Sequence, residues 1–239
     1  MAGFCLVGRD RRLNILTEWQ TVAMVLAHRL SMSRAGDGEI KLARGESCKT
    51  QPHDPELTKR MRRVLRHDDD RVLVCIPRIW PDEPPLATPG FWPQHRAAFE
   101  RFCDPAKSYG SSFVSRRDAW PIPNEPLYWQ TWQEVWRGRP ALLITGSGKG
   151  GRTRKLLATA ASIDVLECPR QGAWAAHQGL RADALTWAAA KRDPIAILAC
   201  GATATVLAHE LGVRGVQALD VGHAAQAFAR VNQKELDEP

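Results

Sequence analysis

The sequence predicts an α/β protein with helices on both faces of a mostly parallel sheet. From residue 128 onward, short apolar runs alternate with segments of helical periodicity. Apolar runs without polar alternation are typical of parallel strands that are buried on both faces. The chain has 239 residues, of which 44% are hydrophobic, so it is long enough to bury such a core without a metal or a disulfide.

The second half of the chain supplies most of the predicted sheet. One helix carries Trp129, Trp132 and Trp136 at i, i+3 and i+7, a spacing that predicts a stripe of core side chains. The expected strands then cover residues 141–145, 163–167, 195–200 and 216–220, and the expected helices between them cover 153–161, 182–191 and 203–211.

The first half begins with two helices whose N-termini are marked in the sequence. Thr17 and Gln20 fit a capping-box pattern that opens an apolar helix. Asp54 and Pro55 open a second helix, and an apolar strand over residues 71–76 follows it.

A proline-rich segment separates the two halves. Residues 77–127 hold ten of the 16 prolines and predict long loops around one helix near 93–102. Loops of that length in a compact domain usually carry function. We therefore expect one domain over residues 1–232, with 77–127 as an insertion, and a polar tail over 233–239.

The charge narrows the classes of partner. A net charge of +7 favours an anionic partner, such as nucleic acid, an anionic membrane surface or a phosphorylated small molecule. The densest basic cluster lies on the second predicted helix, and we interpret it as a solvated helix face. Its members are Lys59, Arg60, Arg62, Arg63 and Arg66.

The cysteines and the apolar runs indicate the compartment. The 6 cysteines lie far apart without C-x-x-C spacing, which argues against a disulfide framework or a structural zinc site and favours a reducing compartment. No apolar run approaches the roughly 18 residues of a membrane span, and the first residues lack the basic region of a signal peptide. We expect a cytoplasmic protein without a membrane span.

In parallel α/β sheets, ligands bind beyond the carboxyl ends of the strands, so the segments that follow the predicted strands are the place for a site. These segments are 77–78, 146–151, 168–169, 201–203 and 220–223.

The first candidate is the glycine-rich segment 146–151, which matches G-x-G-x-x-G between a predicted strand and a predicted helix. Backbone amides at such a helix start can approach a phosphate, and Lys149 and Arg152 could assist them. Glu167 ends the next strand, where the ribose-binding acid of a dinucleotide-binding fold would stand. The pattern favours phosphate binding of some kind and leaves open both NAD binding and a plain strand-to-helix turn.

The second candidate is the pair Asp37 and Glu39, two carboxylates separated by one glycine. Oxygen ligands of this kind suit Mg²⁺ or Mn²⁺, which usually share them with substrate phosphates. A surface turn before a helix over residues 40–43 explains the same residues equally well. Local features do not choose between these two interpretations.

The segment Arg34-x-Gly36-Asp37-Gly38-Glu39 is followed by further matches to one known pattern, in the same order. These are Gly45, Gln51, Tyr109-Gly110, Phe113, Ser115-Arg116, the strand 142–146, Glu167-Cys168-Pro169, 201–208 and 215–223. The ordered set covers roughly residues 30–225 and resembles the GT-D fold glycosyltransferases. The resemblance implies a GT-D type Rossmann-like domain that transfers a sugar from a nucleotide sugar, typically a UDP-sugar, to a glycan, a glycoconjugate or a small molecule.

The resemblance also suggests roles for residues. Asp37 and Glu39 become the D-x-E pair that holds a divalent cation, Mn²⁺ or Mg²⁺. Asp220 and His223, at a strand terminus, can approach the cation, the sugar hydroxyls or the acceptor, the last as a base. The residues expected to contact the donor or another part of the substrate are Arg34, Gly38, Gln51, Ser115, Arg116, Gly146, Lys149, Arg152, Pro169 and Thr203. Of these, Lys149 and Arg152 could hold either the diphosphate or the acceptor. Two departures from the family pattern are Gly172, where an asparagine is usual, and Ala225, in a segment where acidic residues are usual.

The sequence therefore predicts a metal-dependent nucleotide-sugar glycosyltransferase with no specific nucleic-acid partner. Its tryptophan-rich loops could cover a homodimer contact as readily as an acceptor. Three alternatives stay open. They are an NAD-dependent oxidoreductase that uses segment 146–151, a non-catalytic binder of nucleic acid or another anionic polymer, and a degenerate transferase that binds its donor without turnover.

Overall fold

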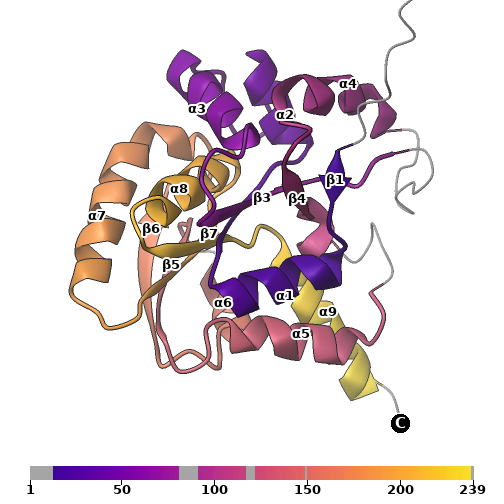
Figure 1. Cartoon of the computed structure of the whole chain (residues 1–239). Coiled ribbons are helices and arrows are strands. Elements are labelled where there is room, and N and C mark those ends of the chain that lie inside the picture. The colour runs from indigo at the N-terminus through magenta and orange to yellow at the C-terminus, as the bar shows by residue number, and fades with distance from the viewer. Residues whose placement is uncertain (1–12, 81–90, 117–121, 149, 238–239) are drawn as a thin grey trace, which may run out of the picture.

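The computed structural model describes residues 13–80, 91–116, 122–148 and 150–237. They form one α/β domain around an eight-stranded sheet in which every pairing is parallel, in the order β1-β4-β3-β2-β8-β7-β5-β6 (Figure 1). The strands are β1 (Asn14–Ile15), β2 (Ser31–Arg34), β3 (Val72–Ile76), β4 (Ser108–Ser111), β5 (Pro140–Gly146), β6 (Ser162–Cys168), β7 (Ile195–Ala199) and β8 (Gln217–Asp220).

Helices cover both faces of this sheet. On one face lie α1 (Glu18–His28), α5 (Glu125–Glu134), α6 (Gly150–Leu156) and α9 (Ala224–Asp237). On the other lie α2 (Asp37–Arg44), α3 (Pro55–Leu65), α4 (Pro93–Phe102), α7 (His177–Ala189) and α8 (Ala202–Gly212). Two short 3₁₀ helices, η1 (Ser112–Ser115) and η2 (Ala173–Ala176), complete the described elements. The predicted fold class is confirmed.

The side chains of single strands divide between the two faces, as strand geometry requires. In β5, Ala141 and Leu143 belong to the cluster under α1 and α5, whereas Leu142 and Ile144 belong to the cluster under α7 and α8. All four are buried. This is why the strands are continuously apolar in the sequence.

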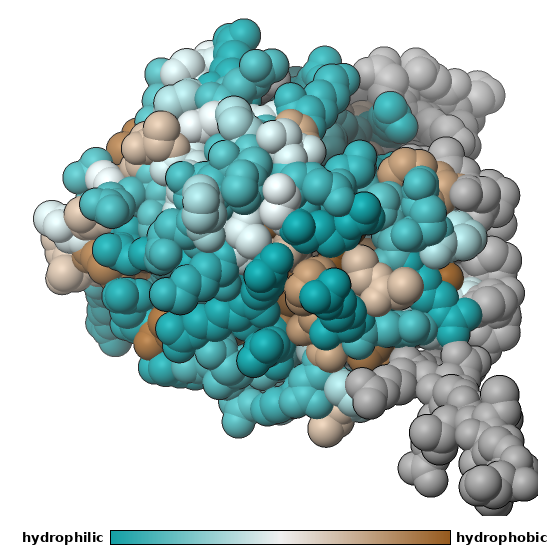
Figure 2. Space-filling view, turned by 90° about the horizontal axis from the view of Figure 1, so that it is seen from above, coloured by the Kyte–Doolittle hydropathy of each residue, from teal (hydrophilic) through white to brown (hydrophobic). Residues whose placement is uncertain are grey.

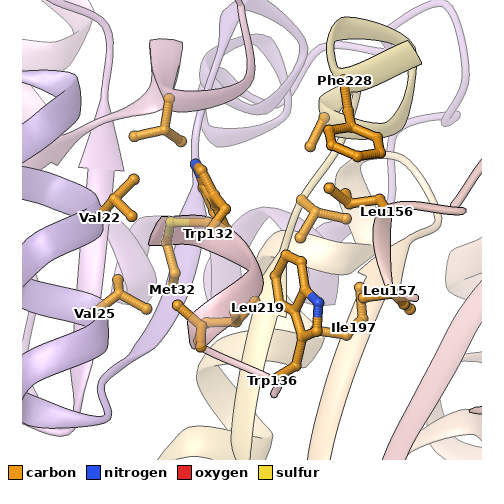
Figure 3. Close-up of a cluster of buried hydrophobic side chains, with 14 of the residues drawn as sticks. Val22, Val25, Met32, Trp132, Trp136, Leu156, Leu157, Ile197, Leu219 and Phe228 are labelled. Atoms are coloured by element: carbon orange, nitrogen blue, oxygen red, sulfur yellow. The ribbon is translucent and has the colours of Figure 1, made fainter. Parts of the chain in front are cut away.

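The tryptophan stripe lies in the core, as predicted. Trp129, Trp132 and Trp136 are buried in one cluster with residues of α1, the sheet and α9. Figure 3 shows Trp132 and Trp136 in this cluster. Helix α5 ends at Glu134, so Trp136 lies just beyond it, with its ring 5.9 Å from that of Trp132. Figure 3 shows Trp136 beside Leu157 and Ile197, so the stripe fills the centre of this face.

Both predicted helix starts are confirmed by their caps. Gln20 N donates to Thr17 Oγ1 and Thr17 N donates to Gln20 Oε1, the two bonds of a capping box. Leu57 N donates to Asp54 Oδ1 at 2.9 Å, which satisfies one of the otherwise unpaired amides of the first turn of α3.

Several elements differ from the sequence prediction, among them α6, β4, η1 and α9. Helix α6 begins at Gly150, inside the glycine-rich segment 146–151, and it ends at Leu156, so it starts and ends earlier than the helix expected over 153–161. Strand β4 and η1 lie inside segment 77–127, which was expected to hold loops and one helix. Helix α9 runs to Asp237, so most of the expected polar tail is helical; its alanine-rich start lacks the capping signals that marked the other helices.

The strand order reverses at β2 and at β5, among other places. Strand β2 lies between β3 and β8, and β5 lies between β6 and β7. The connections leaving the carboxyl ends of neighbouring strands diverge at such positions and leave a crevice in which ligands bind. No helix of the described residues is both long and apolar enough to cross a membrane.

The basic cluster on α3 is a solvated helix face, as interpreted from the sequence. Arg60 Nε pairs with Glu56, Arg62 Nε donates to the carbonyl of Ala43, and Arg63 Nε pairs with Asp68. Seen from above Figure 1, the surface is mostly hydrophilic and its hydrophobic areas are small and separate (Figure 2). This face therefore presents no large apolar patch, and three arginines of α3 are bonded to other protein groups.

Candidate functional site

A cleft of about 980 Å³ opens at the carboxyl ends of the strands and extends over the reversal points at β2 and β5. Eleven of the residues singled out in the sequence line it: Arg34, Asp37, Gly38, Glu39, Gln51, Arg116, Gly146, Arg152, Pro169, Asp220 and His223. Two others are buried next to it without lining it, namely Ser115 and Thr203. Lys149 lies outside the described residues.

Asp37 and Glu39 stand in the first turn of α2, at the carboxyl end of β2. The sequence left open a surface turn before a helix over 40–43, but the helix already begins at Asp37. Gly36 N donates to Glu39 Oε2 at 2.7 Å, so Glu39 bends back to cap the helix that carries it. Acidic side chains at a helix N-terminus are also stabilised by the helix dipole.

The two carboxylates keep oxygen atoms available for a ligand. Asp37 accepts no hydrogen bond from any described residue, and Gly36 is the described donor to Glu39. Burial raises the pKa of Glu39 to about 7; the Gly36 amide opposes this shift, and the nearby charge of Asp220 adds to it. Because burial and a neighbouring negative charge destabilise the ionised form of Glu39, a divalent cation bound there would stabilise it.

Two carboxylates are not a complete protein cage. Within the described ranges, no group of three or more histidine, cysteine, aspartate or glutamate side chains could hold a metal. Mg²⁺ is commonly bound through one or two carboxylates, with substrate phosphates and water completing its shell. The donor set of Asp37 and Glu39 therefore fits a cation that arrives with, or waits for, a phosphorylated substrate.

Arg34 is held by protein groups on three sides. Its Nε donates to the backbone carbonyl of Asp220 at 2.8 Å, and its Nη1 donates to Ser115 Oγ at 2.7 Å and to the carbonyl of Ser112 at 3.1 Å. Its Nη2 pairs with Asp220 Oδ1 at 3.3 Å, and both side chains are largely buried, 12% and 6% exposed. We call this set the Arg34 clamp; it ties β2, β8 and η1 together beneath the acidic pair.

Asp220 is occupied within the same clamp. Besides Arg34, its Oδ1 accepts from Gly222 N at 3.1 Å, and its Oδ2 accepts from Thr205 Oγ1 at 3.3 Å. Burial raises the pKa of Asp220, while Arg34 lowers it. The geometry thus gives Asp220 the role of positioning Arg34. His223 also lines the cleft.

The glycine-rich loop is shaped around an arginine that the sequence did not single out. A Cβ on Gly146 would lie 3.3 Å from Arg170 Cγ, and one on Gly148 would lie 3.0 Å from Arg170 Nη2. Arg170 Nε donates to the carbonyl of Ser147 at 2.7 Å. The two glycines therefore make room for Arg170, which lines the cleft.

The glycine-rich loop bonds to Glu167, the acid that would bind the ribose in a dinucleotide-binding fold. Gly148 N donates to Glu167 Oε1 at 3.1 Å, so the loop amide and the carboxylate satisfy each other. In a dinucleotide fold they would face a pyrophosphate and a ribose. This pairing gives the G-x-G-x-x-G pattern a structural explanation that does not involve NAD.

Gln51 joins the cleft to the segment where the chain departs from the family pattern. Gln51 Oε1 accepts from Trp174 N at 3.2 Å, and Gly172 N donates to the carbonyl of Thr50 at 2.9 Å. The Trp174 ring stacks on His177 at 4.2 Å. The loop after β6 is thereby fixed to the loop after α2.

Several cleft residues were missed by the sequence reasoning. Lys41 lies one turn after Asp37 on α2, and Lys49 follows in the next loop. Phe113, which already belongs to the family match, and Trp92 form an aromatic wall of the cleft with ring centroids 5.4 Å apart. The i, i+4 spacing of Asp37 and Lys41 could have revealed the lysine once the helix start was known; the aromatic pair is brought together by the fold.

The chain resembles one family of known proteins and several solved structures. The family described as "Glycosyltransferase GT-D fold" matches residues 32–234. Probable glycosyl transferase Gly of Streptococcus gordonii is 28% identical over 227 residues, covering 90% of this chain and 32% of that protein. Glycosyltransferase GlyD of Streptococcus pneumoniae serotype 4 is 29% identical over 214 residues, covering 85% of this chain and 26% of that protein. The chain thus spans about a third or less of the curated relatives it matches.

Two solved structures share the fold over nearly the whole chain. One, described as a new glycosyltransferase from Streptococcus sanguinis, is 26% identical with a TM-score of 0.83 and covers 93% of this chain and 86% of its own. The other, described as a domain with a distinct glycosyltransferase fold, is 27% identical with a TM-score of 0.84 and covers 94% and 83%.

Proposed function

The chain belongs to the GT-D fold glycosyltransferase family, and from this premise we propose that it transfers a sugar from a UDP-sugar to a hydroxyl group of a glycan, a glycoconjugate or a small molecule. The observation that carries the proposal is the pair Asp37 and Glu39 at the N-terminus of α2, beside the reversal point at β2 and inside the cleft. Ligand pockets of this kind usually measure about 300–1,000 Å³, so the cleft can hold a nucleotide sugar.

The acidic pair supplies the metal site of the proposal. Asp37 and Glu39 would hold Mn²⁺ or Mg²⁺, and Glu39 can do so while Gly36 N still bonds its second oxygen. A cation at this place neutralises charge that develops on the diphosphate as it leaves the sugar.

Two lysines add positive charge at the same end of the cleft. Lys41 and Lys49 line it, and neither has an ion-pair partner in the part of the chain that the structure describes. They are placed to bind phosphate oxygens near α2. The Arg34 clamp contributes indirectly, because it fixes the end of β2 from which α2 begins.

His223 is the residue we propose to assist the acceptor. It follows β8 at the carboxyl edge and lines the cleft. An imidazole can take the proton of an acceptor hydroxyl as the oxygen bonds to the sugar and the sugar–phosphate bond breaks.

The described cysteines carry free thiols, which suits the reducing cytoplasm we expect for the reaction.

The test is calorimetric titration of the protein with UDP, with and without Mn²⁺, and with NAD⁺ beside it. We expect UDP binding that requires the cation and is weakened at least about tenfold in Asp37→Asn and Glu39→Gln, which keep size and hydrogen-bonding shape but remove one charge. Glu46→Gln is the matched control, because Glu46 is exposed just beyond α2 and pairs with Arg44. Tight NAD⁺ binding, or UDP binding that ignores both the cation and the variants, would contradict the proposal.

A further inference from the structure

The cleft has a second basic end that the proposed donor does not explain. Arg152 on α6 and Arg170 after β6 both line the cleft and are exposed. Helix α6 packs on the opposite face of the sheet from α2, which carries the acidic pair. Arg152 therefore approaches the cleft from the face opposite α2, and Arg170 approaches it from the end of β6.

The order of the strands in the sheet gives the distance between the acidic pair, Asp37 and Glu39, and the two arginines. Three strand spacings lie between β2 and β5, and four lie between β2 and β6, which is about 14 Å and about 19 Å along the sheet at about 4.8 Å each. A phosphate oxygen bound to a cation lies about 2 Å from it, so a diphosphate held at Asp37 and Glu39 stays close to α2. The remaining parts of an ordinary UDP-sugar, the base, the ribose and a neutral hexose, carry no negative charge to meet the arginines.

Arg170 is held in a position that suits anion binding, unlike a freely moving surface side chain. Its Nε is bonded to the carbonyl of Ser147, and its side chain lies against Gly146 and Gly148, which have no side chains of their own to exclude it. Its two terminal amines bond to no described residue. A guanidinium fixed in this way loses little freedom when it binds an anion, and it presents a planar fork that fits phosphate or carboxylate.

No acidic side chain of the described residues forms an ion pair with Arg152 or Arg170. Arg152 has no ion-pair partner among the described residues, and the nearest acid of the loop, Glu167, accepts instead from the amide of Gly148. The Arg34 clamp shows the contrast: there the guanidinium meets a buried carboxylate, a hydroxyl and two carbonyls.

We propose that Arg152 and Arg170 form an acceptor subsite for an anionic group, a phosphate or a carboxylate carried by the acceptor. The inference rests on the proposed function, because it assigns the donor diphosphate to the Asp37 end and the acceptor to the β5–β6 end. It narrows the acceptor from any hydroxyl compound to one with a negative charge near the hydroxyl that receives the sugar.

The experiment titrates UDP-saturated protein, in Mg²⁺, with phenyl phosphate, and uses phenyl glucoside as the neutral probe. Wild-type protein should bind phenyl phosphate and bind phenyl glucoside distinctly more weakly. Arg170→Gln and Arg152→Gln should each weaken phenyl phosphate binding about tenfold, the usual loss for a charge-assisted hydrogen bond. Arg170→Lys, which keeps the charge but loses the bond to Ser147, should fall between wild type and Arg170→Gln.

Arg154→Gln is the matched control. Arg154 lies on the same helix and is exposed, but it does not line the cleft, so it removes the same charge without touching the subsite. It should leave phenyl phosphate binding within about twofold of wild type, and none of the variants should change UDP affinity by more than that. A general electrostatic effect would instead move Arg154→Gln together with the other two.

Three results would overturn the inference. Loss of UDP affinity in the Arg152 and Arg170 variants would place the donor diphosphate there. Arginine-dependent preference for UDP-glucuronate over UDP-glucose would assign the anion to the donor sugar. Absence of phenyl phosphate binding, with or without UDP, would remove the subsite. Phenyl phosphate is also titrated into protein without UDP, so that a missing subsite can be recognised independently of the donor. Failure of the proposed function would appear instead as the absence of UDP binding.

Discussion

Replacement of Gly222 by alanine tests whether the Arg34 clamp organises the cleft. Gly222 has a φ of +46°, and a Cβ there would lie 2.7 Å from Arg34 Cζ and 3.3 Å from Nη1. These atoms belong to a guanidinium fixed by Asp220, Ser115 and backbone carbonyls, so the arginine cannot move aside without breaking its bonds. Alanine must therefore displace Arg34.

The expected cost has two parts. A left-handed backbone conformation costs a non-glycine residue about 1 kcal/mol. Separation of a buried ion pair adds about 3 kcal/mol or more, because Asp220, 6% exposed, keeps its charge without its partner. We expect a loss of about 4 kcal/mol in the free energy of unfolding, or about 12 °C in Tm for a chain of this size.

The assay is urea unfolding with a matched control and a double mutant. Gly215→Ala has the same kind of backbone, with a φ of +83° and nothing within 4 Å of the new Cβ, so it should cost only about 1 kcal/mol. In an Arg34→Ala background, Gly222→Ala should also cost only about 1 kcal/mol, because the clash has gone. Equal losses for Gly222→Ala and Gly215→Ala, or a full loss in the Arg34→Ala background, would refute the reasoning.

Three further predictions use other parts of the molecule. Because Glu39 must be ionised to bind a cation and its pKa is raised to about 7, Mn²⁺ affinity should fall as the pH drops from 8 to 6; an affinity that is flat over this range in a calorimetric titration would contradict the metal site. Burial would raise the pKa of Glu210, but His177 and Arg60 outweigh it and lower it to about 2 from 4.5. A lowered carboxylate pKa stabilises the fold above about pH 4.5 and loses that contribution as the pH falls toward 2, so wild type should lose about 3 kcal/mol more than Glu210→Gln between pH 5 and 2; equal losses in chemical unfolding would reject the network. Trp132→Ala should cost about 3–5 kcal/mol in the same assay, because this fully buried ring would leave a cavity under α1; a cost below 1 kcal/mol would mean that the core collapses around it.

The fold could be predicted from the sequence because its signals are local and agree with one another. Continuous apolar strands, the caps at Thr17 and Asp54, and the spacing of Trp129, Trp132 and Trp136 each report on burial or on one helix terminus. The missed elements lacked such signals. Strand β4 lies in a proline-rich segment, and its tyrosine is buried through contacts with residues far away in the chain.

The sequence predicted many of the residues that line the cleft, but not the bonds that these residues make with one another. The carboxyl ends of the strands and the family resemblance together indicated eleven residues that line one cleft. They did not show that Ser115 would hold Arg34, or that the acidic pair would open a helix, since both depend on side-chain directions after folding. Thr203 is buried in the first turn of α8, and no described group bonds its hydroxyl.

The glycines of the cleft show why sequence alone reaches this limit. A glycine in a loop indicates that something must approach closely, but the approaching group is chosen by the fold. At Gly146 and Gly148 that group is Arg170, and at Gly222 it is Arg34. Arg170 donates one hydrogen bond to the described protein, through Nε, and its terminal amines are available to a ligand. Every side-chain nitrogen of Arg34 is bonded within the protein. The number of bonds an arginine already makes therefore separates a binding residue from a positioning residue, and the experiments on Gly222 and Arg170 test the two sides of that distinction.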